Sequence, residues 1–199
     1  MSLSAPTPTD KQSTQATEPP VCKPRHPKGW LTVREICLFG MLGALMFCSK
    51  LLLEWAPNIH LLALFIIAFT VVYRVKALIP IYVFVLLTGI FNGFNLFLVP
   101  YLYVWLFPWG LTMLLPRRLP TWAAAICYTV IGALHGLLFG VLCAPAQALI
   151  FHLNFEGMLA WIGAGFYFDL LHGIGNLAAC TLVVPLTLLL FKLEEKTKK

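Results

Sequence analysis

The sequence predicts an all-α integral membrane protein, a six-transmembrane-helix bundle with both termini cytoplasmic. Its 199 residues are 60% hydrophobic and only 11% charged, whereas about a quarter of the residues in soluble domains are charged. The apolar residues gather in runs long enough to cross a bilayer, and the basic residues lie between alternate runs. This composition excludes a separate soluble catalytic or nucleotide-binding domain.

The chain divides into three parts. Residues 1–29 are rich in Pro, Thr, Ser and Gln and lack the short apolar core of a secretory signal, so we expect a disordered polar cytoplasmic tail. Residues 30–193 form the predicted six-helix membrane domain, and residues 194–199 form a charged cytoplasmic tail.

Each apolar run is expected to be a helix, because an open strand cannot satisfy its backbone groups in lipid. The second and fourth runs are short for a hydrocarbon core of ~30 Å. The long segment 144–158 is half apolar and too short to cross, so it is expected to lie in the interface or to fold back as a lid. The predicted spans are 31–54, 60–73, 77–96, 99–115, 121–143 and 160–191.

The basic residues predict the orientation. In this topology all but one of the 14 Lys and Arg residues fall on the side of the two termini, and the excess of positive charge marks the cytoplasmic side. The exception, Lys50, has Glu54 four residues later, a spacing that allows a local ion pair. The net charge of +6 is therefore read as a topology signal and not as nucleic-acid binding.

One late helix carries the main candidate for a binding site. Asp169 is the only acidic residue well inside an apolar run, and such groups usually face a cavity or a partner. His172 and Asn176 follow at offsets that place all three on one helical face. A structural hydrogen-bond network, ligand contact, and a proton relay or metal site all remain open for them.

Other polar and aromatic residues are weaker candidates. His135, in the fifth span, is expected at a depth similar to that of Asp169, with a structural or a binding role. Asn92 and Asn95 share a face near the outer end of the third span. The spacing of Tyr101, Trp105 and Trp109 predicts an aromatic stripe, of which the two tryptophans lie deep enough to stack on a planar ring.

A stripe of small residues and several missing motifs complete the pattern. Gly40, Ala44 and Cys48 recur every four residues in the first span, which allows another helix to approach closely. The cysteines show no spacing typical of zinc or disulfides. The sequence also lacks the phosphate-binding loop of ATPases and the HExxH and GxSxG motifs of common hydrolases.

Several segments together resemble the substrate-binding S component of energy-coupling factor (ECF) transporters. The resemblance covers about residues 30–193 and rests on the order of its motifs in a short chain. These motifs are REICLFGMLGALMF, PNIHLLALFI, KALIPIYVFVLLTG and FDLLHGIGN.

The resemblance implies a multi-pass receptor in a prokaryotic plasma membrane that captures a vitamin or related micronutrient. A transmembrane coupling subunit and two ATPase subunits would be its partners, so the chain itself would be neither an enzyme nor bound to a cofactor. Metal transport is not expected, because the cobalt and nickel members use an N-terminal His whereas this chain begins Met1, Ser2, Leu3.

The resemblance also implies roles for particular residues. Gly40 and Ala44 would dock the coupling subunit. Ligand would bind from outside, beneath the loop between the first two helices and against helices four to six. Together with Asn92, the residues in those regions are the predicted substrate-binding set: Trp55, Asn58, His60, Trp105, Trp109, His135, Asp169, His172 and Asn176.

The residue types of this set suit a planar heteroaromatic substrate with donor groups. Two other classes of function stay open. An intramembrane enzyme would use Asp169, His135 and His172 as acid, base or metal ligands. An independent secondary carrier is disfavoured by the absence of a visible inverted repeat.

Overall fold

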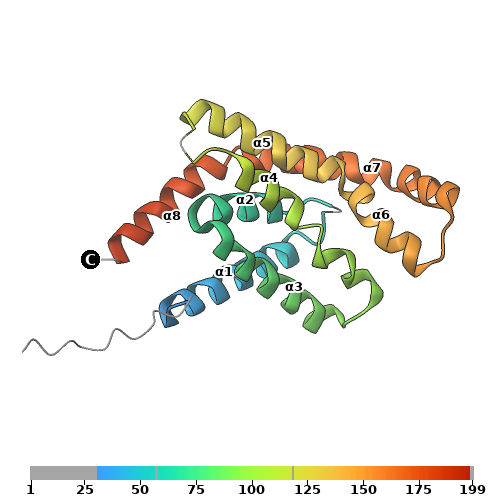
Figure 1. Cartoon of the computed structure of the whole chain (residues 1–199), viewed down its shortest axis with the longest axis horizontal. Helices are drawn as coiled ribbons and strands as arrows, with labels where there is room; N and C mark the ends of the chain where they lie inside the picture. The colour runs from blue at the N-terminus through green and yellow to red at the C-terminus, as the bar shows by residue number, and fades with distance from the viewer. Residues whose placement is uncertain (1–30, 57, 118, 198–199) are drawn as a thin grey trace, which may run out of the picture. The chain divides into compact units, whose positions relative to one another are not determined.

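A computed structural model describes residues 31–56, 58–117 and 119–197, and every regular element in them is helical. This confirms the predicted all-α class. The predicted tail 1–29 lies outside the described residues. The helices, labelled in Figure 1, are α1 (Val33–Leu52), α2 (Leu62–Tyr73), α3 (Leu78–Asn92), α4 (Leu106–Leu114), α5 (Thr121–Leu137), α6 (Phe139–Ile150), α7 (Phe155–Cys180) and α8 (Val183–Thr197), with the 3-10 turns η1 (Arg74–Ala77), η2 (Leu96–Leu98) and η3 (Pro100–Leu102).

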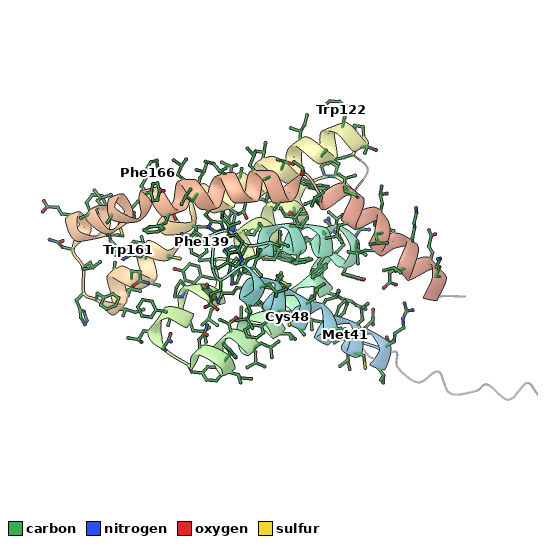
Figure 2. The ribbon with its side chains drawn as sticks, turned by 180° about the vertical axis from the view of Figure 1, so that it is seen from behind. Met41, Cys48, Trp122, Phe139, Trp161 and Phe166 are labelled. Carbon is green, nitrogen blue, oxygen red and sulfur yellow. The ribbon has the colours of Figure 1, made fainter. Side chains whose placement is uncertain are left out.

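Several of these helices are long and apolar enough to cross a membrane. Among the described residues four helical runs meet this condition, namely 33–52, 62–92, 96–114 and 121–150. A fifth is added if α7 and α8, which are bent by 48° relative to one another, form one broken span. Large apolar side chains such as Trp122 and Phe166 point outward from α5 and α7 (Figure 2). The fold is therefore that of a helical protein suited to a membrane.

The helix boundaries depart from the apolar runs in four places. The third helix ends at Asn92 because Gly93 takes a positive φ of 83°. The fourth run begins with two 3-10 turns, so its α-helix starts only at Leu106. Helix α6 extends to Ile150 and so takes up the first half of the segment expected at the interface or as a lid. The last run breaks after Cys180, and α8 continues past the predicted boundary at residue 193.

Helix α2 forms the centre of the core. Its residues from Leu62 to Thr70 are all buried, and it packs against α4, α5, α7 and α8. A helix buried all round needs no polar face, which explains why its sequence, LALFIIAFTVVY, is almost uniformly apolar. The site described below is built around the start of this helix.

Helix α5 lies beside the later part of α7 (Figure 1). Glycines allow this close approach: a Cβ at Gly136 would lie 2.6 Å from the backbone nitrogen of Gly173, and one at Gly132 would collide with the Cys180 sulfur. Gly173 thus leaves room for the close approach of α5. The contact also brings His135 of α5 next to His172 of α7.

Paired charges collect at one end of the bundle. Lys76 forms a 2.6 Å ion pair with Glu35, and Arg34 lies 3.6 Å from Glu194. The Arg74 guanidinium donates to the Met113 carbonyl at 2.9 Å. These contacts join the start of α1, the turn η1, the end of α4 and the end of α8. We call this region, defined by these six residues, the ion-pair end.

Candidate functional site

Four aromatic side chains with ring nitrogens meet beside the start of α2. His60 lies on the loop before α2, Trp105 immediately before α4, His135 on α5 and His172 on α7. The ring centroids of His60 and His172 are 4.5 Å apart, and those of His135 and His172 are 5.6 Å apart. Trp105 lies 5.5 Å from His135. We call these four residues the imidazole cluster.

The polar atoms of the imidazole cluster are buried and unpaired. His135 and His172 are 0% and 1% exposed, and Trp105 is equally buried. Both ring nitrogens of His135 and of His172 lack a hydrogen-bond partner among the described residues, as do Trp105 Nε1 and His60 Nδ1. A buried polar group without a partner costs about 1–3 kcal/mol. Several of them in one place indicate a binding site and not a well-packed core.

The charge state of His60 follows from its surroundings on the loop between α1 and α2. Burial, with a smaller contribution from the nearby positive charge of Lys50, lowers the pKa of His60 to about 4. The ring is therefore neutral at pH 7 and carries one donor and one acceptor nitrogen. It offers hydrogen bonds to a ligand without adding charge.

Asp169 joins two helices. Its two carboxylate oxygens accept the backbone N–H of Gly140 at 3.1 and 3.0 Å. Gly140 lies in the first turn of α6, so a carboxylate on α7 caps this helix and complements its dipole. Of the roles predicted for Asp169, the structure favours the hydrogen-bond network. Among the described residues no hydrogen bond joins Asp169 to His135.

The predicted shared face of Asp169, His172 and Asn176 is confirmed, since all three are buried along α7. Asn176 Nδ2 donates to the Gly132 carbonyl at 3.1 Å, while its Oδ1 has no partner among the described residues. Asn176 therefore helps to hold α5 against α7, and it keeps one acceptor available.

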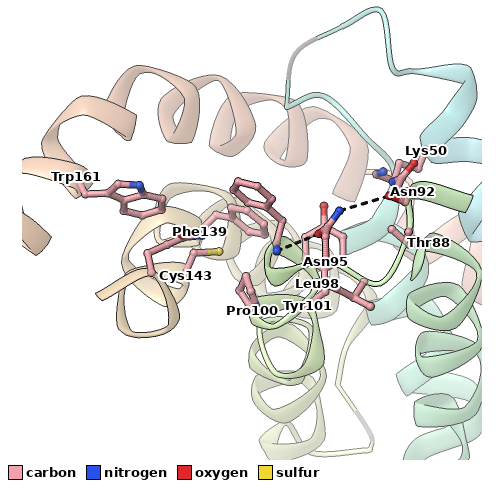
Figure 3. Close-up of a pocket in the computed structure, with 13 residues that line it drawn as sticks. Lys50, Thr88, Asn92, Asn95, Leu98, Pro100, Tyr101, Phe139, Cys143 and Trp161 are labelled. Atoms are coloured by element: carbon pink, nitrogen blue, oxygen red, sulfur yellow. Dashed lines mark hydrogen bonds between the residues drawn. The ribbon is translucent and has the colours of Figure 1, made fainter. Parts of the chain in front are cut away.

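A cavity of about 310 Å³ lies beside the imidazole cluster (Figure 3), at the lower end of the roughly 300–1,000 Å³ typical of ligand pockets. Phe139 lines it and also contacts His172, with ring centroids 4.9 Å apart. Tyr101 likewise lines the cavity and lies 5.2 Å from Trp105. The cavity and the cluster therefore share a wall of two rings. The lining residues are Lys50, Thr88, Asn92, Gly93, Asn95, Phe97, Leu98, Pro100, Tyr101, Phe139, Cys143, Gln147 and Trp161.

The structure brings together only part of the predicted set. His60, Trp105, His135 and His172 form the cluster, and Asn92 lines the cavity. Trp55 is 82% exposed, and neither it nor Asn58, which is half-buried with a φ of 57°, lines this cavity.

Two local predictions fail. Trp109 was expected to continue a stripe from Tyr101, but the chain is not one continuous helix there, because Tyr103 has non-helical angles. Trp109 Nε1 instead donates to the Arg74 carbonyl at 3.3 Å, toward the ion-pair end. The ion pair allowed between Lys50 and Glu54 does not form, since α1 ends at Leu52 and Lys50 lines the cavity.

Sequence reasoning missed much of the cavity wall. Phe139, Cys143 and Gln147 recur every four residues on α6. Gln147 is the one strongly polar side chain of that helix, a signal that the sequence offered. Trp161 on α7 lies near several other aromatic residues in the sequence, so nothing there marked it as a cavity residue.

The glycines of α1 have different surroundings. A Cβ at Gly43 would collide with Val83 of α3, so Gly43 makes the internal helix contact. At Gly40 a Cβ would meet nothing within 4 Å, and its neighbour Met41 is 72% exposed (Figure 2). Ala44 is half-buried and Cys48 exposed. The face around Gly40 is thus open among the described residues.

Within the described ranges no three His, Cys, Asp or Glu side chains are arranged to hold a metal ion. No protein-family model, curated protein or solved structure matches the chain.

Proposed function

We propose that this chain is a membrane-embedded substrate-binding (S) subunit of an ECF transporter, which captures a vitamin or related small micronutrient at a prokaryotic plasma membrane. One observation carries the proposal: a cluster of buried, unpaired ring nitrogens beside a cavity of ligand size within a helical bundle. Such a site suits binding and release of a small molecule.

The proposal includes six crossings with both termini cytoplasmic. The start of α1, the turn η1, the end of α4 and the end of α8 share the ion-pair end. Such sharing is expected if the chain returns to one side after every second crossing. Arg74, whose φ of 56° interrupts the 62–92 run, would mark one such return. The excess of Lys and Arg assigns this side to the cytoplasm, so the cavity would face outward.

The proposed substrate is planar and heteroaromatic. Trp105 and Phe139 offer ring faces, and the unpaired nitrogens of His135 and His172 offer directional hydrogen bonds. Asp169 contributes by holding α6 in place. The enzyme alternative gains no support from this arrangement, because both Asp169 oxygens are engaged by Gly140.

The transmembrane coupling subunit would dock on the open face of α1 around Gly40 and Ala44. Small residues there allow close helix approach, and no described part of the chain covers Gly40. Two ATPase subunits would supply the energy, since the sequence has no phosphate-binding loop of its own.

A binding screen on the purified full chain in detergent tests the proposal. Vitamins, their precursors and modified bases would be screened by thermal shift and then by calorimetry. We expect one compound to raise the melting temperature and to bind stoichiometrically without being converted. His172→Ala should abolish this binding, while His152→Ala, at an exposed histidine outside the site, should not.

Catalytic conversion of a compound, or binding that is indifferent to His172, would overturn the proposal. Asp169→Asn separates the direct role from the positioning role. Unchanged affinity in that variant would remove Asp169 from the ligand contacts and leave it as the cap of α6.

A further inference from the structure

The charge of the cavity indicates what class of molecule it binds. Lys50 is the only charged residue among the described residues that line it, and no carboxylate is among them. The Lys50 ammonium forms no ion pair with any described residue. It lies at one side of the cavity in Figure 3, and Trp161 lies at the other, with Phe139 and Tyr101 between them.

Two polar side chains on the cavity wall, Asn95 and Thr88, are already engaged in hydrogen bonds within the chain. Asn95 Oδ1 accepts the Phe97 N–H at 3.0 Å, and the Thr88 hydroxyl donates to the Phe84 carbonyl at 2.9 Å. Gln147 differs: it is 5% exposed, it lines the cavity, and its amide has no hydrogen-bond partner among the described residues. On the cavity wall, the groups left for a ligand include the Lys50 ammonium and the side-chain amides of Gln147 and Asn92.

We propose that the cavity binds a small aromatic organic anion, with a carboxylate held by Lys50 and the ring packed against Phe139 and Trp161. The inference rests on the proposed function and narrows its substrate class from planar heteroaromatics in general to those with a negative charge. An uncharged ligand would cover Lys50 and leave the ammonium without a counter-charge, which is costly away from water. An anion gains from the weak screening of a partly enclosed site.

The test compares aromatic carboxylates with their neutral amides on the purified full chain in detergent. Suitable pairs are nicotinate with nicotinamide, and indole-3-acetate with indole-3-acetamide. We expect at least one carboxylate to raise the melting temperature and to bind at least tenfold more tightly than its amide. Raising the salt from about 0.05 to 0.5 M should weaken that preference, because salt screens exposed charge.

Variants at Lys50 test whether this residue causes the preference for carboxylates over amides. Lys50→Gln should lose at least tenfold in carboxylate affinity without any loss of amide affinity, and Lys50→Arg should retain most of the carboxylate affinity. The matched control is Lys192→Gln on α8, an exposed lysine outside the cavity, which should have no effect.

The outcomes separate this inference from the proposed function. One contrary result is a neutral compound that binds as tightly as the corresponding acid, with an affinity that depends on His172 and not on Lys50. That result would overturn the proposal of an anionic substrate and would leave the proposed receptor function standing. If no carboxylate in the panel binds, the proposal of an anionic substrate is also overturned. The wider screen of vitamins then tests the proposed receptor function independently.

Discussion

The two ends of the bundle treat their polar groups in opposite ways. At the ion-pair end, Lys76 pairs with Glu35 and Arg34 with Glu194, and the Arg74 and Trp109 side chains donate to the carbonyls of Met113 and Arg74. Only Arg74 Nε is buried there without a partner among the described residues. Around the cavity, the nitrogens of His135, His172 and Trp105 are buried without partners. The first arrangement stabilises the fold. The second costs stability, and such a cost is typical of sites that bind ligands.

Replacing a cluster histidine should produce the largest effect and should separate stability from binding. We expect His172→Phe to reduce affinity for the identified ligand at least a hundredfold. The same change should raise the free energy of unfolding of the ligand-free chain by about 1 kcal/mol, because it removes buried unpaired nitrogens and keeps a ring. Calorimetry and thermal unfolding measure the two quantities. A less stable variant that still binds would show that the cluster is structural.

Overpacking the contact between α5 and α7 should have the second largest effect. Gly136→Val places new carbons against the backbone of Gly173, and we expect a loss of about 1–3 kcal/mol in the free energy of unfolding. The matched control is Gly163→Val on α7, where a Cβ would meet nothing within 4 Å. Equal melting temperatures for both variants would contradict the close packing that positions His135 and His172.

The pH dependence of stability should show the buried state of His60. Its pKa is about 4 in the folded chain and 6.5 for an ordinary histidine, so the unfolded state binds more protons between these values. The contribution to stability is complete above pH 6.5 and is lost as the pH falls toward 4. We expect a fall of a few degrees in melting temperature between pH 7 and 4.5. This dependence should be weaker in His60→Gln.

A change at the ion-pair end should have the smallest effect. The Lys76 and Glu35 side chains are each about 30% exposed, so the pair contributes only about 0.5–1 kcal/mol. Lys76→Gln should therefore lower the melting temperature by one to three degrees and leave ligand affinity unchanged. A change in affinity comparable to that of His172→Phe would contradict the separation of the two ends.

Much of the fold was predictable because long apolar runs have few alternatives in a membrane. The first and second helices were placed within about two residues of their observed starts and ends. The failures occur where backbone geometry intervenes. Gly93 ends α3 by taking a positive φ, and the 3-10 turns before α4 put Trp109 out of register with Tyr101.

The site was predictable only in part, for a related reason. Periodicity correctly placed His172 and Asn176 on one buried face, since a single helix fixes their spacing. It could not show that Gly140 occupies the oxygens of Asp169, because that contact depends on how α6 starts after the break at Leu138. Nor could it show that Gln147 and Lys50 line the same cavity, since these residues lie on helices far apart in the sequence.

The hydrogen bonds from Gly140 to Asp169 also affect how specificity can evolve. They tie α6 to α7, so Gln147 and Trp161 stand on one fixed side of the cavity. The other side includes residues 93–101, which form loop and short 3-10 turns and no α-helix. We therefore expect substitutions in that stretch to change which ligand the cavity accepts while the hydrogen bonds between α6 and α7 stay in place.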